Sequence, residues 1–117
     1  MKIAINTCYG GFNLSDAAFE LLLDKKGIEY EKIKSKYDSS MYYEKGHVKE
    51  NDFYLSPYAM CGDRSDPHLI EVIEELGYKA NGYSAHLKIV EIPEGVEWYV
   101  HDYDGLEHVA ENHRVWG

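Results

Sequence analysis

The sequence predicts an α+β fold in which two helices pack on a mostly antiparallel sheet of about five strands. Two segments place apolar residues at helical spacing between clear start and stop signals, several short segments have the pattern of strands, and Asp104-Gly105 marks a tight hairpin. The expected order is strand, helix, strand, a long excursion, helix and three strands. At 117 residues, the chain fits a single domain over 1–117 that can bury a core without disulfides.

The two helices are the most strongly marked elements. The first is expected to begin after Ser15, whose hydroxyl can accept a hydrogen bond from a first-turn N–H, and to end at Gly27. The second is expected to begin at Asp66-Pro67, where proline at the first helical position loses no hydrogen bond, and to end at Gly77. Both carry an apolar face that a sheet could cover.

Five strands are expected, over residues 2–6, 28–31, 87–92, 96–103 and 106–111. A two-residue Asp104-Gly105 loop would set the register of the last two, with His101 opposite His108 and Asp102 opposite Glu107. One face of this hairpin would then combine apolar side chains with acids, namely Trp98, Val100, Val109, Asp102, Glu107 and Glu111.

Residues 34–64 show no sustained period and contain six scattered aromatic residues. A structureless stretch of this length is unusual in a compact domain. We expect an excursion that covers a sheet edge or a pocket, with room for one short helix or strand. Mobility of this segment until a ligand binds is the alternative.

The net charge of −9 is concentrated in the second half, where residues 59–117 carry twelve acids against four bases. Such a field disfavours long nucleic acid and anionic membranes as partners, although a small anion remains compatible with one arginine and a few backbone amides. There is no long apolar run, and polar Asn6 interrupts the N-terminal apolar stretch, so we expect a cytoplasmic protein with reduced Cys8 and Cys61.

The best candidate for a ligand site is the glycine-bearing turn between the first strand and the first helix. Glycines allow a close approach of backbone to ligand, and a helix N-terminus favours anions. The expected ligand-binding residues come from this turn and from the two arginines: Asn6, Cys8, Tyr9, Gly10, Gly11, Phe12, Arg64 and Arg114. A plain tight turn and two structural salt bridges are the alternatives.

Metal binding and catalysis are not supported by the pattern. His101 and His108 would supply two imidazoles, but zinc requires three or four protein ligands. Cys8 beside Gly10 and Gly11 has no obvious base at a suitable spacing. We therefore expect no metal, no cofactor and no catalytic residues, and a protein that is not an enzyme.

Several segments resemble a family of small proteins found in bacteriophage and prophage genomes. The likeness covers about the first 27 and the last 50 residues, whereas residues 34–62 depart from it. The matching motifs are MKIAINTCYGGFNLS, LIEVIEELG, ANG, residues 87–93, VEW, YDG, VAE and HRVW. The resemblance implies a phage origin and does not by itself imply an activity.

Three functional hypotheses follow. The first is a phage-type protein, expected to be a homo-oligomer, that captures a small anionic or nucleotide-like ligand, such as a nucleotide-derived second messenger of bacterial antiviral defence. It would bind through the Cys8–Ser15 turn, Arg64 and aromatic residues of the irregular segment. This hypothesis uses class-level analogy with oligomeric sponge proteins. The alternatives are an inhibitor that docks on a host protein through its acidic surface, and a small hydrolase that uses Cys8.

Overall fold

The computed structural model describes residues 1–36 and 39–111, and it confirms the α+β class. The helices are α1 (Asp16–Lys25), α2 (Pro57–Met60) and α3 (Pro67–Leu76), with 3₁₀ turns η1 (Asn51–Phe53) and η2 (Gly77–Ala80). The strands are β1 (Lys2–Asn6), β2 (Tyr30–Lys34), β3 (Ser40–Glu44), β4 (Leu87–Glu91), β5 (Trp98–Tyr103) and β6 (Leu106–Glu111).

The described strands do not form the expected single sheet of about five strands. They form three separate antiparallel pairs, β1–β4, β2–β3 and β5–β6. The strand that was not predicted is β3, which lies inside the predicted excursion and pairs along its whole length with β2. The second strand also begins later than the expected residues 28–31, at Tyr30.

Strand β1 shows why the sheet does not continue. One of its edges pairs with β4 from Lys2↔Glu91 to Asn6↔Leu87. On the other edge, the Ala4 N–H donates to the Arg64 carbonyl at 2.8 Å, and the Asn6 N–H donates to the Glu107 carboxylate at 2.9 Å. A loop and a side chain therefore occupy the positions that a neighbouring strand would use, which also protects this edge from intermolecular pairing.

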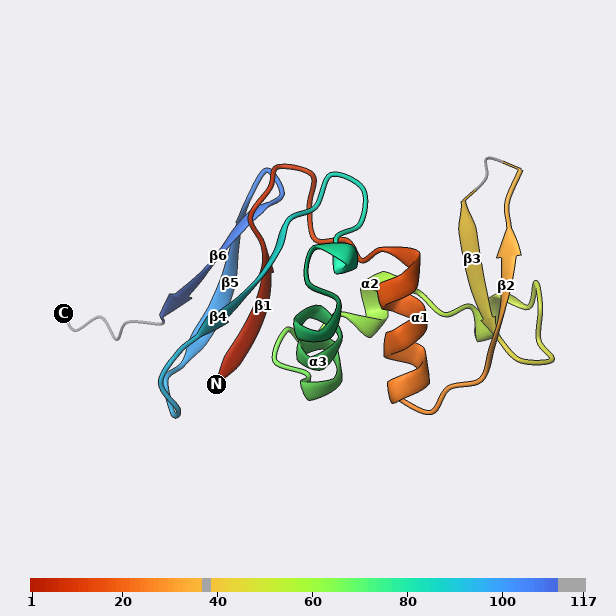
Figure 1. Ribbon diagram of the computed structural model, residues 1–117, viewed down its shortest axis with the longest axis horizontal. Coiled ribbons are helices and arrows are strands. Elements are labelled where there is room, and N and C mark those ends of the chain that lie inside the picture. Colours follow the sequence, from red (N-terminus) through yellow and green to blue (C-terminus); the bar gives the residue numbers. More distant parts are fainter. Residues whose placement is uncertain (37–38, 112–117) are drawn as a thin grey trace.

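The two longer helices lie between groups of strands (Figure 1). The pairs β1–β4 and β5–β6 occupy one end of a molecule measuring 55 × 30 × 27 Å, and the β2–β3 hairpin occupies the other. The core joins α1, α3 and β1 with the first residue of β4. It includes Ala4, Ala18, Phe19, Leu22, Leu23, Leu69, Val72 and Leu87.

Local signals at the helix ends are confirmed. The Ser15 hydroxyl accepts a hydrogen bond from the Ala18 N–H, and the Asp66 carboxylate accepts one from the His68 N–H. Gly27 follows α1 with φ of 73°, in the left-handed region that glycine occupies without steric cost. These ends are set by short-range chemistry, which is why the sequence predicted them well.

The predicted hairpin register is also confirmed, with His101↔His108 and Asp102↔Glu107 as cross-strand pairs. The face that combines apolar side chains with acids turns partly inward, so that Glu107 is buried. The opposite face carries the two histidines in the open, with their ring centroids 4.7 Å apart.

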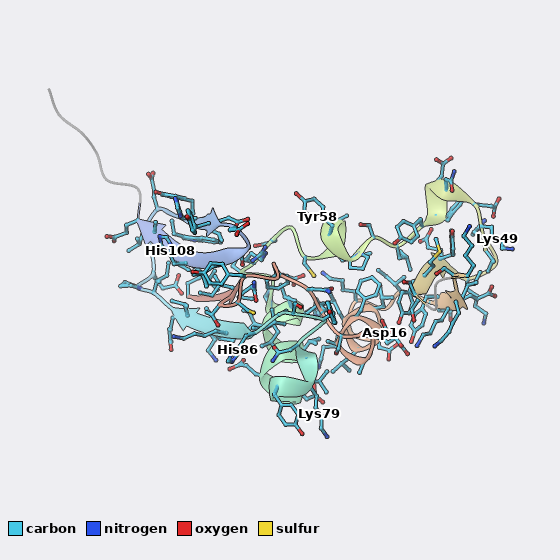
Figure 2. All side chains as sticks on the ribbon, turned by 90° about the horizontal axis from the view of Figure 1, so that it is seen from above. Asp16, Lys49, Tyr58, Lys79, His86 and His108 are labelled. Carbon is cyan, nitrogen blue, oxygen red and sulfur yellow. The ribbon has the colours of Figure 1, made fainter. Side chains whose placement is uncertain are left out.

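The excursion is structured over most of its described length. Besides β3 it contains η1 and α2, and its Tyr42 and Leu55 join the core. Helix α2 lies on the same side of the molecule as the β5–β6 hairpin, and Tyr58 projects from it into the open (Figure 2). In the described ranges, no helix has the length and apolarity to cross a membrane.

Candidate functional site

The glycine turn after β1 is packed tightly against two other loops. A Cβ atom on Gly10 would lie 2.0 Å from the Ser84 carbonyl oxygen, so only glycine fits there. Gly105 at the tip of the β5–β6 hairpin also approaches the turn closely, since its Cβ would lie 2.6 Å from the Tyr9 carbonyl oxygen. Close backbone contact explains these two glycines without a ligand.

Asn6 holds these loops together from the end of β1. Its side chain is fully buried and donates to the carbonyls of Cys8 and Gly105, at 2.5 and 2.7 Å. The amide oxygen accepts from the His86 N–H at 2.8 Å. Because these bonds account for both ends of the amide, Asn6 acts as a structural residue and offers nothing to a ligand.

Arg64 is held by a buried carboxylate. Its guanidinium donates to both oxygens of Glu107 at 2.6 and 2.9 Å, a bidentate geometry, and the side chains of Arg64 and Glu107 are only 19% and 6% exposed. The guanidinium carbon lies 3.8 Å from the centre of the Phe12 ring, a cation–π contact. Arg64 therefore forms a structural salt bridge, which was the alternative to a ligand-binding role.

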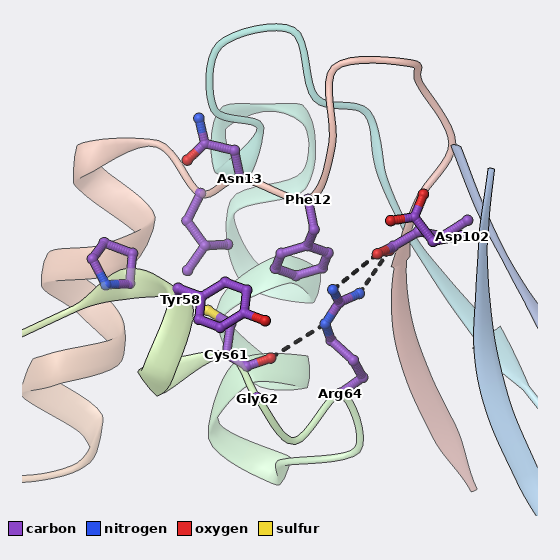
Figure 3. A pocket seen from close by; sticks show the side chains of 10 residues that line it. Phe12, Asn13, Tyr58, Cys61, Gly62, Arg64 and Asp102 are labelled. Atoms are coloured by element: carbon purple, nitrogen blue, oxygen red, sulfur yellow. Dashed lines mark hydrogen bonds and ion pairs between the residues drawn. The ribbon is translucent and has the colours of Figure 1, made fainter. Parts of the chain in front are cut away.

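A cavity of about 500 Å³ opens beside this ion pair, within the size range of small-molecule sites. The glycine turn, α2 with the residues that follow it, and the β5–β6 hairpin surround it (Figure 3). Its lining is Phe12, Asn13, Leu14, Pro57, Tyr58, Cys61, Gly62, Arg64, Asp102 and Glu107.

Two aromatic rings enter this cavity from different elements. Phe12 comes from the glycine turn and is held by Arg64, whereas Tyr58 comes from α2 and is 92% exposed. An exposed aromatic ring beside a cavity offers a flat apolar face on which a planar ligand can stack. The excursion therefore contributes one wall of the cavity.

Cys61 lines the cavity as an inert thiol. Burial raises the pKa of Cys61 to about 11, because the thiolate would lose its hydration. A group with this pKa is almost entirely protonated at neutral pH and is a weak nucleophile. Cys61 therefore contributes a small apolar surface to the cavity.

The structure places the predicted site residues differently from one another. Phe12 and Arg64 both line the cavity, whereas Asn6 and Gly10 are used in packing. Tyr9 is largely exposed and Gly11 adopts a positive φ of 88°, but neither lines the cavity. Arg114 lies outside the described residues.

Cys8 is a free, half-buried thiol in the turn. No hydrogen bond joins its sulfur to a histidine or a carboxylate in the described part of the chain. Among the described residues, the structure therefore shows no base that could activate Cys8, as the hydrolase hypothesis requires. His101 and His108 likewise form no cluster with a third metal-binding side chain within residues 1–36 and 39–111.

Glu107 and Asp102 were not predicted as site residues, and Tyr58 was predicted only as one of several aromatic residues of the excursion. One signal was available for Glu107, because the hairpin register placed this acid on the same face as Val100 and Val109. An acid on an apolar strand face needs a buried cationic partner. With only two arginines in the chain, Arg64 was a natural candidate.

Comparisons of the chain with protein-family models, curated proteins and solved structures find no match.

Proposed function

We propose that this protein is a non-enzymatic binder of a small nucleotide-like molecule, held in the cavity between the glycine turn and α2. The observation that carries the proposal is the cavity itself, whose walls combine two aromatic rings with a fixed polar corner. Ligand sites commonly pair mostly apolar walls with a few well-placed polar groups.

The polar corner is rigid before any ligand arrives. Besides Glu107, the Arg64 guanidinium donates to the carbonyl oxygens of Cys61 at 3.2 Å and Ala4 at 3.3 Å. These contacts tie the loop before α3 to β1 and β6. A preformed wall reduces the entropy lost when a ligand binds.

The biological setting in this proposal comes from the resemblance to phage proteins. A protein that binds a nucleotide-derived second messenger without cleaving it would lower the free concentration of the messenger and so blunt a host defence response. Sequestration requires affinity and sufficient copies but no catalytic group. The expected homo-oligomer stays a prediction, which light scattering of the purified chain measures.

Ligand depletion tests the proposal directly. The protein is mixed with a panel of nucleosides, nucleotides and cyclic dinucleotides, and the free ligand is measured by chromatography before and after heat denaturation. Capture predicts depletion followed by release of the unchanged molecule, whereas recovery of a product would indicate an enzyme. No depletion of any member of the panel contradicts the proposal.

A pair of matched tyrosine variants assigns the site. Tyr58→Ala removes a ring at the cavity mouth and should reduce binding by about tenfold or more, the scale of one stacked base. Tyr83→Ala removes a ring that is 90% exposed and does not line the cavity, so binding should be unchanged. Equal effects of the two variants would place the site elsewhere.

A further inference from the structure

Resting on the proposed function, we infer that the cavity recognises the heteroaromatic ring of its ligand and leaves any phosphate in solvent. The charges of the lining residues support this inference. One cation, Arg64, faces two carboxylates, Glu107 and Asp102. The lining therefore has a formal charge of −1, which opposes the entry of a phosphate.

The single cation has little left to offer an anion. A guanidinium has five N–H donors. Two of those of Arg64 bind the Glu107 carboxylate, and two more are directed to the carbonyls of Cys61 and Ala4. A phosphate could use the guanidinium fork only by displacing Glu107.

Displacing Glu107 is unfavourable because this carboxylate is buried. The Glu107 side chain is 6% exposed, and its remaining hydrogen bond comes from the Asn6 N–H at 2.9 Å. Without Arg64 it would be a buried charge with no cationic partner, an arrangement that proteins avoid. The ion pair therefore stays closed, and Arg64 presents a guanidinium that is already neutralised.

Asp102 adds an acceptor that suits a nitrogen heterocycle. Its Oδ1 accepts from the Gly105 N–H at 2.8 Å, which orients the carboxylate at the hairpin tip. The second oxygen forms no hydrogen bond within the described residues. A ring N–H or an exocyclic amino group can donate to this oxygen, whereas a phosphate is repelled by it.

Tyr58 supplies the stacking surface. The ring is almost fully exposed, and no contact within residues 1–36 and 39–111 occupies either of its faces. One face of the nearby Phe12 ring is covered by the Arg64 guanidinium. A planar heterocycle is therefore expected to stack on Tyr58 with its polar edge toward Asp102, and a ribose with its phosphate extends outward.

Titration calorimetry with four nucleosides and their 5′-monophosphates tests this inference. We expect at least one nucleoside to bind as tightly as its monophosphate or more tightly, and lower salt to give no gain for the monophosphate. Asp102→Asn should strengthen binding of the monophosphate relative to the nucleoside by about threefold to tenfold, since it removes one negative charge. Asp104→Asn, at the same turn but outside the lining, is the matched control and should leave the ratio unchanged.

The outcomes separate this inference from the proposed function. A monophosphate that binds about tenfold more tightly than its nucleoside, with affinity rising at low salt, would overturn the inference while supporting ligand capture. An unchanged ratio in Asp102→Asn would overturn the assigned role of Asp102. Failure of every nucleoside, nucleotide and cyclic dinucleotide to bind would instead overturn the proposed function, and this inference with it.

Discussion

Two regions of the molecule use similar chemistry with different degrees of burial. At the junction of β1, β6 and the loop before α3, Arg64 pairs with Glu107, and both side chains are largely hidden from solvent. At the far end, Glu20 on α1 accepts hydrogen bonds from Lys32 at 3.1 Å and Tyr42 at 2.8 Å, on the β2–β3 hairpin. The Lys32 and Glu20 side chains are 36% and 31% exposed.

The difference shows why only one of these regions forms a defined wall of a cavity. A buried bidentate pair has one low-energy arrangement, because any other leaves a charge without solvation. A half-exposed lysine can exchange its partner for water at little cost. The junction therefore holds Phe12 and the cavity in place. The cluster of Glu20, Lys32 and Tyr42, here called the far cluster, mainly attaches the β2–β3 hairpin to α1.

The largest expected effect is at the buried pair. Glu107→Ala should lower the free energy of unfolding by about 3–5 kcal/mol, because Arg64 would remain as a partly buried charge without its partner. Urea denaturation followed by circular dichroism measures this change. The double variant Arg64→Met/Glu107→Met should lose less unfolding free energy than Glu107→Ala alone, because it leaves no unpaired charge. A loss below about 1 kcal/mol in Glu107→Ala would show that this ion pair is not a rigid element of the fold.

The next effect concerns the glycine turn that supports Phe12. Gly10→Ala would place a methyl group against the Ser84 carbonyl, so the two loops must separate. We expect the free energy of unfolding to fall by about 1–3 kcal/mol. Thermal unfolding measures it. Gly62→Ala is the control, since its nearest contact would be 3.5 Å from the Ala59 oxygen and no positive φ is involved. Equal stability of both variants would contradict the close packing of the turn.

The far cluster should become weaker at high pH. Burial raises the pKa of Tyr42 above its ordinary value of 10.0, and the hydrogen bond to Glu20 adds to the shift. The stabilisation from neutral Tyr42 is therefore complete below pH 10 and is lost as the pH rises through the folded-state pKa. The urea concentration at the unfolding midpoint should decrease as the pH rises above 10, and it should decrease less in Tyr42→Phe than in the unaltered protein. An identical decrease in the two proteins would exclude this contribution from Tyr42.

The smallest effect is expected at the exposed ion pair. Lys32→Ala should change the free energy of unfolding by about 0.2–1 kcal/mol, and high salt should reduce the difference from the unaltered protein. Urea denaturation at low and high ionic strength measures it. A loss comparable to that in Glu107→Ala would remove the contrast between the two regions.

Local signals predicted a large part of the fold. Ser15 and Asp66 cap their helices as expected, and the Asp104-Gly105 turn sets the hairpin register, because each interaction involves residues within a few positions of each other. The sheet was predicted less well. Whether strands join depends on which groups occupy their edges, and at β1 those groups come from Arg64 and Glu107, 60 and 103 positions away from Ala4.

The site was predicted only in part for the same reason. Phe12 and Arg64 were named from the sequence because a glycine turn and a rare arginine are visible in one dimension. Tyr58 was one aromatic residue among many in an irregular segment, and nothing local distinguished it. Its position at the cavity mouth follows from the path of the whole excursion, which first pairs as β3 and then returns through α2.

By itself, the sequence determined the helix ends, the hairpin register, the acidic charge and the α+β class, since all of these depend on composition or on neighbouring residues. The tertiary structure alone decided that Arg64 is neutralised by Glu107, that three strand pairs replace one sheet, and that Tyr58 and Phe12 line the same cavity. These features depend on contacts between distant parts of the chain, whose geometry is set only when the core is packed.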